Sequence, residues 1–162
     1  VYAQGYANET GLPLKAGVMK NKFSSRNLFN HDFEGREKAI KLKYNVLRQT
    51  VGGKRVALVD DSIMMGDTAR RIIAMLKKAG AKEVHLRIGS PRIIHECLFG
   101  VQMPGEDKLL AARGRTNEEM CAHLGCDSIG FLPIEALRET GLSCDHTYCT
   151  SCLDRKTHLK MK

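Results

Sequence analysis

The pattern of apolar and polar positions predicts a helix over residues 34–51 that is followed by a buried strand. The apolar positions of this helix recur at helical spacing: Ile40, Tyr44, Leu47 and Val51. Residues 56–59 then form an unbroken apolar run that ends in two aspartates. A short apolar run without alternation is typical of a strand that is covered on both faces, as in a parallel sheet.

A second strand and its connecting helix are predicted next. Residues 62–66 form a connection, and either Asp67 or Thr68 can cap a helix that ends at Gly80. Residues 84–88 alternate between apolar and polar positions and predict the second strand. Strand–helix–strand units of this length make right-handed crossovers, so we expect the two strands to be parallel.

The following segment continues the alternation of helix and strand. Thr116 and Glu119 have the spacing of a capping box at the start of a helix. Residues 128–132 predict a short strand, and Pro133 suits the first turn of a last helix. We therefore expect an α/β domain over residues 1–141, with a central parallel sheet flanked by helices.

The overall composition supports one core and a separate tail. Apolar residues make up 43% of the chain, which is enough for a core. Residues 142–162 form a Cys-rich, basic tail that is too poor in apolar residues to build one. No run of 18 apolar residues and no secretion signal occur, so we expect a cytoplasmic protein without a membrane span. Because the chain begins with Val1 rather than Met, we expect a domain truncated at its N-terminus.

The positive charge is concentrated in one part of the chain. Lys and Arg number 26 against 18 Asp and Glu, which gives a net charge of +8. Residues 15–54 hold ten basic and three acidic groups, nearly the whole excess. Such a local excess indicates either a solvated helix face or an anionic partner, which is a nucleic acid, a phosphorylated small molecule or an acidic protein surface.

The segment from Val59 to Thr68 carries the candidate chemistry. Asp60 and Asp61 follow the predicted parallel strand, and open α/β sheets bind ligands at this edge. A Gly-containing turn and a helix N-terminus come next, where free backbone N–H groups favour a phosphate. Carboxylates beside a phosphate suit ribose hydroxyls or Mg²⁺. The spacing therefore favours a ribose-phosphate site, and the alternative is a polar strand end with an ordinary helix cap.

This segment resembles the phosphoribosyl pyrophosphate (PRPP) signature of type I phosphoribosyltransferases. Flanking segments follow one another in order: GLPLKAGVMKNKF, GGKRVALVDDSI, AGAKEVHLRIGSP, HECLFGV and LGCDSIGFLPIEAL. Together they resemble the C-terminal, phosphoribosyltransferase half of the glutamine PRPP amidotransferase family, over nearly all of the chain. The resemblance implies an amidophosphoribosyltransferase of purine synthesis. Such an enzyme transfers ammonia, taken from glutamine at full length, to C1 of PRPP and releases pyrophosphate.

The resemblance implies a role for each matching residue. Asp60 and Asp61 would bind the ribose hydroxyls and Mg²⁺, and Lys20 and Arg26 match basic positions of the family's catalytic loop. The residues that would bind PRPP are Asp60, Asp61, Ser62, Ile63, Met64, Met65, Gly66, Asp67 and Thr68. The resemblance also implies an upstream glutaminase domain, a homo-oligomer and inhibition by purine nucleotides, with no nucleic-acid or membrane partner.

Several positions depart from the family pattern, among them Ser25 and Asn27, which flank Arg26 where the family's catalytic loop has Gly and Thr. Met65 stands where the family has Arg, Asp67 where it has Thr, and Arg92 where a second Pro is usual. A carboxylate beside a dianionic phosphate should weaken binding by about a kcal/mol or more. Two alternatives therefore stay open: a non-catalytic PRPP or nucleotide sensor on the same fold, and another type I phosphoribosyltransferase that acts on a base.

The Cys residues near the C-terminus indicate metal chemistry. Cys149 and Cys152 form a Cys-x₂-Cys pair, which fits Zn²⁺ or an iron–sulfur cluster. Some members of the resembled family carry a [4Fe–4S] cluster, and the positions that match its ligands are Cys97, Cys149 and Cys152. The fourth ligand would be Cys144 or a residue before Val1. Zinc and free thiols are the alternatives.

Overall fold

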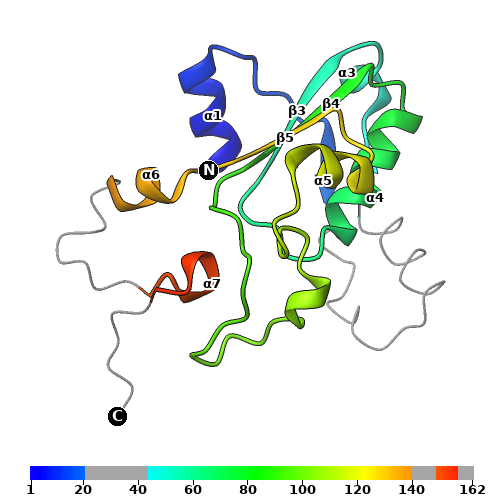
Figure 1. The fold of residues 1–162 in the computed structure, drawn as a ribbon. Coiled ribbons are helices and arrows are strands. Elements are labelled where there is room, and N and C mark those ends of the chain that lie inside the picture. Colours follow the sequence, from blue (N-terminus) through cyan, green and yellow to red (C-terminus); the bar gives the residue numbers. More distant parts are fainter. Residues whose placement is uncertain (21–43, 140–148, 157–162) are drawn as a thin grey trace.

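A parallel sheet forms the centre of the protein. The computed structural model describes residues 1–20, 44–139 and 149–156, and Figure 1 shows their arrangement. The sheet has the order β3-β4-β5, with the strands β3 (Arg55–Asp60), β4 (Glu83–Ile88) and β5 (Ser128–Phe131). Both strand pairs are parallel, and α4 (Asp67–Lys78) connects β3 to β4. The predicted α/β class and strand–helix–strand unit are confirmed.

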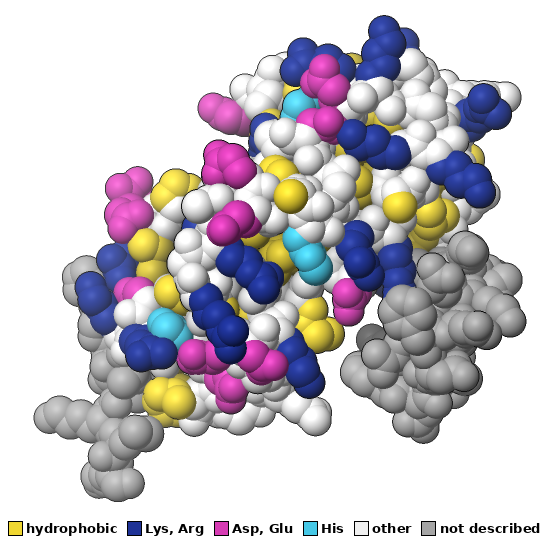
Figure 2. Space-filling view, turned by 45° about the vertical axis from the view of Figure 1, so that its right-hand side comes forward, with side chains coloured by type: hydrophobic (Ala, Val, Ile, Leu, Met, Phe, Trp, Pro, Cys, Tyr) yellow, Lys and Arg dark blue, Asp and Glu magenta, His cyan; other side chains and the backbone are white. Residues whose placement is uncertain are grey.

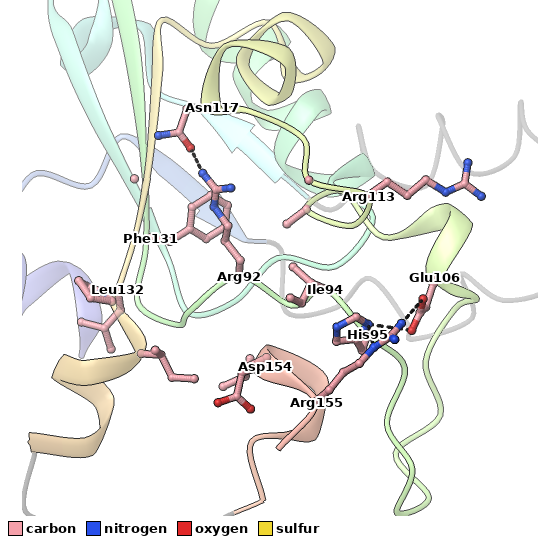
Figure 3. A pocket seen from close by; sticks show the side chains of 16 residues that line it. Arg92, Ile94, His95, Glu106, Arg113, Asn117, Phe131, Leu132, Asp154 and Arg155 are labelled. Carbon is pink, nitrogen blue, oxygen red and sulfur yellow. Dashed lines mark hydrogen bonds and ion pairs between the residues drawn. The ribbon is translucent and has the colours of Figure 1, made fainter. Parts of the chain in front are cut away.

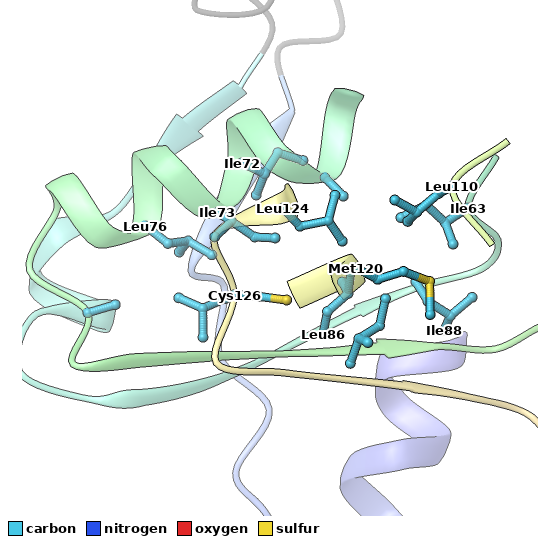
Figure 4. Packing of buried hydrophobic residues seen from close by; sticks show 14 of the residues in the cluster. Ile63, Ile72, Ile73, Leu76, Leu86, Ile88, Leu110, Met120, Leu124 and Cys126 are labelled. Atoms are coloured by element: carbon cyan, nitrogen blue, oxygen red, sulfur yellow. The ribbon is translucent and has the colours of Figure 1, made fainter. Parts of the chain in front are cut away.

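Helices cover both faces of this sheet. The helices α4 and α5 (Asn117–Leu124) pack on one face, and α1 (Tyr2–Thr10) lies on the other (Figures 1 and 4). The core lies between the sheet and the α4–α5 side, where Leu76, Val84, Leu86 and Met120 are fully buried. Burial of one such side chain stabilises the fold by about 1.5–3 kcal/mol.

The alternation predicted for the second strand is present in β4. Val84, Leu86 and Ile88 are buried, whereas the residues that alternate with them are half-buried and polar: Glu83, His85 and Arg87. Two of these polar side chains form a hydrogen bond with each other: His85 Nε2 lies 2.8 Å from Glu83 Oε2. One face of β4 therefore belongs to the core and the other carries a polar network.

The C-terminal elements begin and end close to where the sequence predicts. The Glu119 N–H donates to Thr116 Oγ1 at 3.2 Å, and the Thr116 N–H donates to Glu119 Oε2 at 2.8 Å, which completes the capping box. The helix α6 (Ile134–Glu139) starts directly after Pro133. The 3₁₀ turn η1 (Glu106–Lys108) and the short helix α7 (Ser151–Asp154) were not predicted.

The predicted helix over residues 34–51 is wrong over residues 44–46, and among the described residues only its last turn is present. The strand β2 (Tyr44–Val46) pairs antiparallel with β1 (Val18–Lys20), and the helical turn α3 covers only Arg48–Val51. Tyr44 and Val46 both pack against the core, because alternate residues of a strand share a face. Residues 34–43 lie outside the described residues.

The expectation that the first strand is covered on both faces is also wrong. In β3, Val56 and Leu58 pack against the core, but Ala57 is exposed. Ala57 lies on the side of α1, where a cavity of about 630 Å³ separates the helix from the strand. The helix therefore covers this face of β3 only in part.

The described surface carries both signs of charge. On the face shown in Figure 2, Lys and Arg side chains lie among Asp and Glu. Much of the basic segment, residues 21–43, falls outside the described residues. None of the helices described is long and apolar enough to cross a membrane.

Candidate functional site

The candidate PRPP segment leaves the C-terminal edge of β3 and leads into α4. The Ile63 side chain is 7% exposed and packs in the core. The Leu110 N–H donates to the Met64 carbonyl at 2.7 Å. These contacts attach the loop to the core. The side chains of Met64 and Met65 face the solvent instead and are 38% and 43% exposed.

Gly66 closes the loop and precedes α4. Its φ is 87°, and a Cβ at this position would lie 2.8 Å from Leu124 Cδ2, so only glycine fits without a shift. Gly66 is itself the N-cap, and among the described residues no side chain caps this helix. The expectation that Asp67 or Thr68 caps α4 is therefore wrong. The first N–H groups of α4 are left without a side-chain partner, and the positive end of the helix favours an anion there.

The two aspartates stand at the end of β3, where the loop to α4 begins. The pKa of Asp60 is raised, mainly because the surrounding protein desolvates its carboxyl; the Asp61 N–H, which donates at 3.0 Å, lowers it, and the Asp61 charge raises it. The Asp61 carboxylate accepts a hydrogen bond from Ser62 Oγ at 3.1 Å. Carboxylate and hydroxyl oxygens are the ligands that Mg²⁺ and sugar hydroxyls require, so this group of residues fits both.

The β1–β2 ribbon approaches these carboxylates. Lys20 ends β1 and pairs in register with Tyr44. The pKa of Tyr44 is raised, first by burial and then by the negative charge of Asp60, so the end of the ribbon is within electrostatic reach of Asp60. Lys20 is exposed at this end, and the predicted catalytic residue Arg26 lies outside the described residues.

Tyr44 is a residue near Asp60 that the sequence analysis placed in the wrong element. It was assigned to a helix because residues 44, 47 and 51 also fit helical spacing. The alternation of Tyr44, Asn45 and Val46, two of which are aromatic or β-branched, was the available signal for a strand.

The Cys residues proposed as metal ligands approach one another. The N–H groups of Ile94 and His95 donate to the Cys152 carbonyl at 2.9 and 3.1 Å, which fixes α7 beside the segment that carries Cys97. The pKa of the Cys152 thiol is raised, mainly by burial and further by the charges of Cys97 and Cys149. No group of three potential ligands within the described residues is arranged to hold a metal ion, and Cys144 lies outside them.

The other two described Cys residues belong to the core. Cys126 is 9% exposed, and Cys121 packs against the same cluster. Burial and the neighbouring Cys121 raise the pKa of the Cys126 thiol to about 12. A thiol with so high a pKa is not ionised near neutral pH, which suits a packing role.

The parallel sheet with helices on both faces agrees with a type I phosphoribosyltransferase fold, which the solved structure described below shares. No family model matches the chain. It is 46% identical over 156 residues to the amidophosphoribosyltransferase of Archaeoglobus fulgidus. The aligned residues are 95% of this chain and 34% of that protein. It is 40% identical to the Bacillus subtilis enzyme of the same name, and that alignment covers 93% of this chain and 32% of the B. subtilis protein.

A solved structure supports the same relationship. The B. subtilis glutamine PRPP amidotransferase complexed with ADP and GMP matches with a TM-score of 0.78 and 37% identity, covering 96% of this chain and 35% of that one. The chain is therefore a homologue of the amidophosphoribosyltransferases, and it spans about a third of their length. The fold class and the family resemblance expected from the sequence are confirmed.

Proposed function

We propose that the protein is an amidophosphoribosyltransferase and that this chain supplies its PRPP site. In this reaction ammonia forms a bond to C1 of PRPP, the bond from C1 to the pyrophosphate oxygen breaks, and 5-phosphoribosylamine and pyrophosphate result. The observation that supports the proposal is that Asp60 and Asp61 come at the end of a parallel strand and that a short loop leads from them to the N-terminus of α4, where Gly66 is the N-cap. This arrangement offers oxygen ligands for the ribose and N–H donors for its 5′-phosphate.

Each part of the site has a separate task in the proposed reaction. Asp60 and Asp61 orient the ribose hydroxyls and would hold Mg²⁺, directly or through water. Bound Mg²⁺ supplies charge neutralisation of the pyrophosphate. Lys20 and Arg26 are the protein cations for the leaving group, on which negative charge grows as the C1–O bond breaks.

The same residues fit a second candidate function, a PRPP or nucleotide sensor. Met65 and Asp67 are both exposed at the phosphate loop, where the family pattern has Arg and Thr. The exchange removes one positive charge and adds one negative charge beside the proposed phosphate position. These side chains favour weaker binding of PRPP, and a protein that binds PRPP without turning it over would be a sensor.

The complete protein is proposed to have further partners. Its relatives are about three times longer than this chain, and we propose that a glutaminase domain supplies ammonia from glutamine. We also propose a homo-oligomer in the cytoplasm that purine nucleotides inhibit, since a homologue has been solved with ADP and GMP.

A [4Fe–4S] cluster is proposed on Cys97, Cys149 and Cys152, with Cys144 as a candidate fourth ligand. Support comes from the hydrogen bonds of the Ile94 and His95 N–H groups to the Cys152 carbonyl, which place α7 beside the segment that carries Cys97. Anaerobic visible absorption with iron and sulfide analysis tests the cluster. Stoichiometric zinc without iron would replace it by a zinc site, and metal-free protein would leave free thiols.

Pyrophosphate release tests the proposed reaction. The complete protein is mixed with PRPP, Mg²⁺ and either glutamine or ammonia, with Asp60→Asn as the site variant and Glu135→Gln, an exposed change on α6, as the control. Turnover that only Asp60→Asn abolishes supports the proposal. PRPP binding without turnover would favour the sensor, turnover only with a purine or pyrimidine base would favour another phosphoribosyltransferase, and failure to bind PRPP would exclude all three.

A further inference from the structure

A large cavity lies at the C-terminal ends of β4 and β5, outside the proposed PRPP segment. Its volume is about 910 Å³, within the range of small-molecule sites. The segment that follows β4, the loop around residue 113, the start of α6 and the end of α7 enclose it (Figure 3). No residue from 60 to 68 lines it, so it is a separate feature of the same sheet edge.

Arg92 presents a fixed positive charge in this cavity. Its guanidinium lies 5.4 Å from the centroid of the Phe131 ring, and it donates to Asn117 Oδ1 at 2.6 Å and to the Arg115 carbonyl at 3.2 Å. These two bonds use two of its five N–H donors. Among the described residues no carboxylate lies within ion-pair distance of Arg92. The guanidinium is therefore held in place with donors to spare, as recognition of an oxyanion requires.

The acidic residues of the cavity already have cationic partners. Glu106 lies 2.9 Å from His95 Nδ1 and 3.5 Å from Arg155 Nη2. Asp154 accepts from Arg138 at 3.0 Å. The negative charges in the wall are thus paired with other cations. The Arg92 charge acts at longer range on Glu118, whose pKa it helps to lower, but it forms no ion pair among the described residues.

The backbone around the cavity is held in an unfavourable conformation at two positions. Arg113 and Arg155 are the non-glycine residues with positive φ in the described chain, at 59° and 61°, and both line this cavity. Such a conformation costs about 1–2 kcal/mol for a residue other than glycine. Backbone strain of this kind clusters at ligand sites.

We propose that this space, the Arg92 cavity, binds a small organic oxyanion that carries an apolar ring. The oxyanion sits on the Arg92 guanidinium, and the ring packs on Ile94, Leu132 and Leu153, which line the same space. A carboxylate or a phosphate can supply the oxyanion, since both match the planar guanidinium. Arg92 replaces the second Pro of the family pattern, so the charge is a feature of this chain.

Ligand-observed NMR on the complete protein tests the cavity, with phenyl phosphate, benzoate, inorganic phosphate and benzyl alcohol as probes. We expect a ring oxyanion to bind at least ten-fold more tightly than inorganic phosphate or benzyl alcohol. The comparison of phenyl phosphate with benzoate identifies the oxyanion. Arg92→Met should weaken binding at least ten-fold and Arg92→Lys by less, whereas Arg48→Met, an exposed change on α3, should leave it unchanged.

Two further variants keep this test decisive. Ile134→Asp leaves Arg92 in place and adds a carboxylate to the cavity wall at the first residue of α6, where an acid suits the helix dipole, so the fold should persist while binding is lost. Asp60→Asn should leave binding unchanged, which separates this site from the PRPP site. The inference is overturned if neither ring oxyanion binds, or if binding survives both Arg92→Met and Ile134→Asp.

Discussion

Asp67→Thr is the sharpest test of the proposed phosphate site. Asp67 is the first residue of α4 and is exposed, so its carboxylate lies at the helix end where the phosphate is proposed to bind. At about 5 Å in water two unit charges interact by about 0.8 kcal/mol, so a dianionic phosphate is repelled by about 1.5 kcal/mol. Replacement by Thr should therefore lower the KM for PRPP about ten-fold.

The same substitution should lower the stability of the protein slightly. An acid in the first turn of a helix gains about 0.3–1 kcal/mol from the helix dipole, and Asp67→Thr removes it. Affinity for PRPP and stability are therefore expected to change in opposite directions. Glu118→Thr is the matched control, because Glu118 is an exposed acid in the first turn of α5 and far from the loop in sequence. It should lose similar stability without changing the KM.

The assay is pyrophosphate release with ammonia as the donor, at several PRPP and salt concentrations, together with thermal unfolding. The gain from Asp67→Thr should shrink as salt rises, because the Debye length is only about 8 Å at physiological ionic strength. An unchanged or higher KM in Asp67→Thr, with the expected small loss of stability, would refute the electrostatic reasoning and the placement of the phosphate at α4.

Three more substitutions test how the site is supported. Gly66→Ala should lower the free energy of unfolding by about 1–3 kcal/mol in urea titrations, because its φ is 87° and its Cβ would meet Leu124. Thr116→Ala should cost about 1 kcal/mol by removing the capping box of α5, seen as a lower Tm. The pKa of Asp127 is lowered, first by Lys77 at 2.6 Å, so its stabilising contribution is present above its ordinary pKa near 4 and is lost as pH falls through the lower folded value. Asp127→Asn should therefore reduce the loss of stability between pH 5 and 3, and an unchanged pH profile would contradict this.

The sequence predicted those parts of the fold that short-range patterns determine. The capping box of Thr116 and Glu119 and the alternation in β4 both depend on residues within one turn or one strand. Burial in β4 follows its alternation because one face meets α4 and α5. Such features do not need knowledge of distant contacts, so the sequence was sufficient for them.

The errors arose where distant contacts decide between local alternatives. Residues 44–51 fit a helix and a strand, and the pairing of Tyr44 with Lys20 across the chain decided for the strand. The apolar run in β3 is compatible with burial on one face or on two, and only the position of α1 shows that Ala57 is exposed. The Arg92 cavity could not be predicted either, because it joins residues from four separate segments.

In the proposed phosphate loop, residues 62–66, different residues determine the backbone conformation and the charge of the surface. Its shape depends on contacts with distant residues, namely the Leu110 N–H on the Met64 carbonyl and the packing of Gly66 against Leu124. The side chains of Met65 and Asp67, which differ from the family pattern, are exposed and take no part in these contacts. The differences therefore change the charge at the proposed phosphate position, while the printed contacts of the loop do not involve these side chains. We therefore predict that substitutions at these two positions change the affinity for PRPP without loss of the fold.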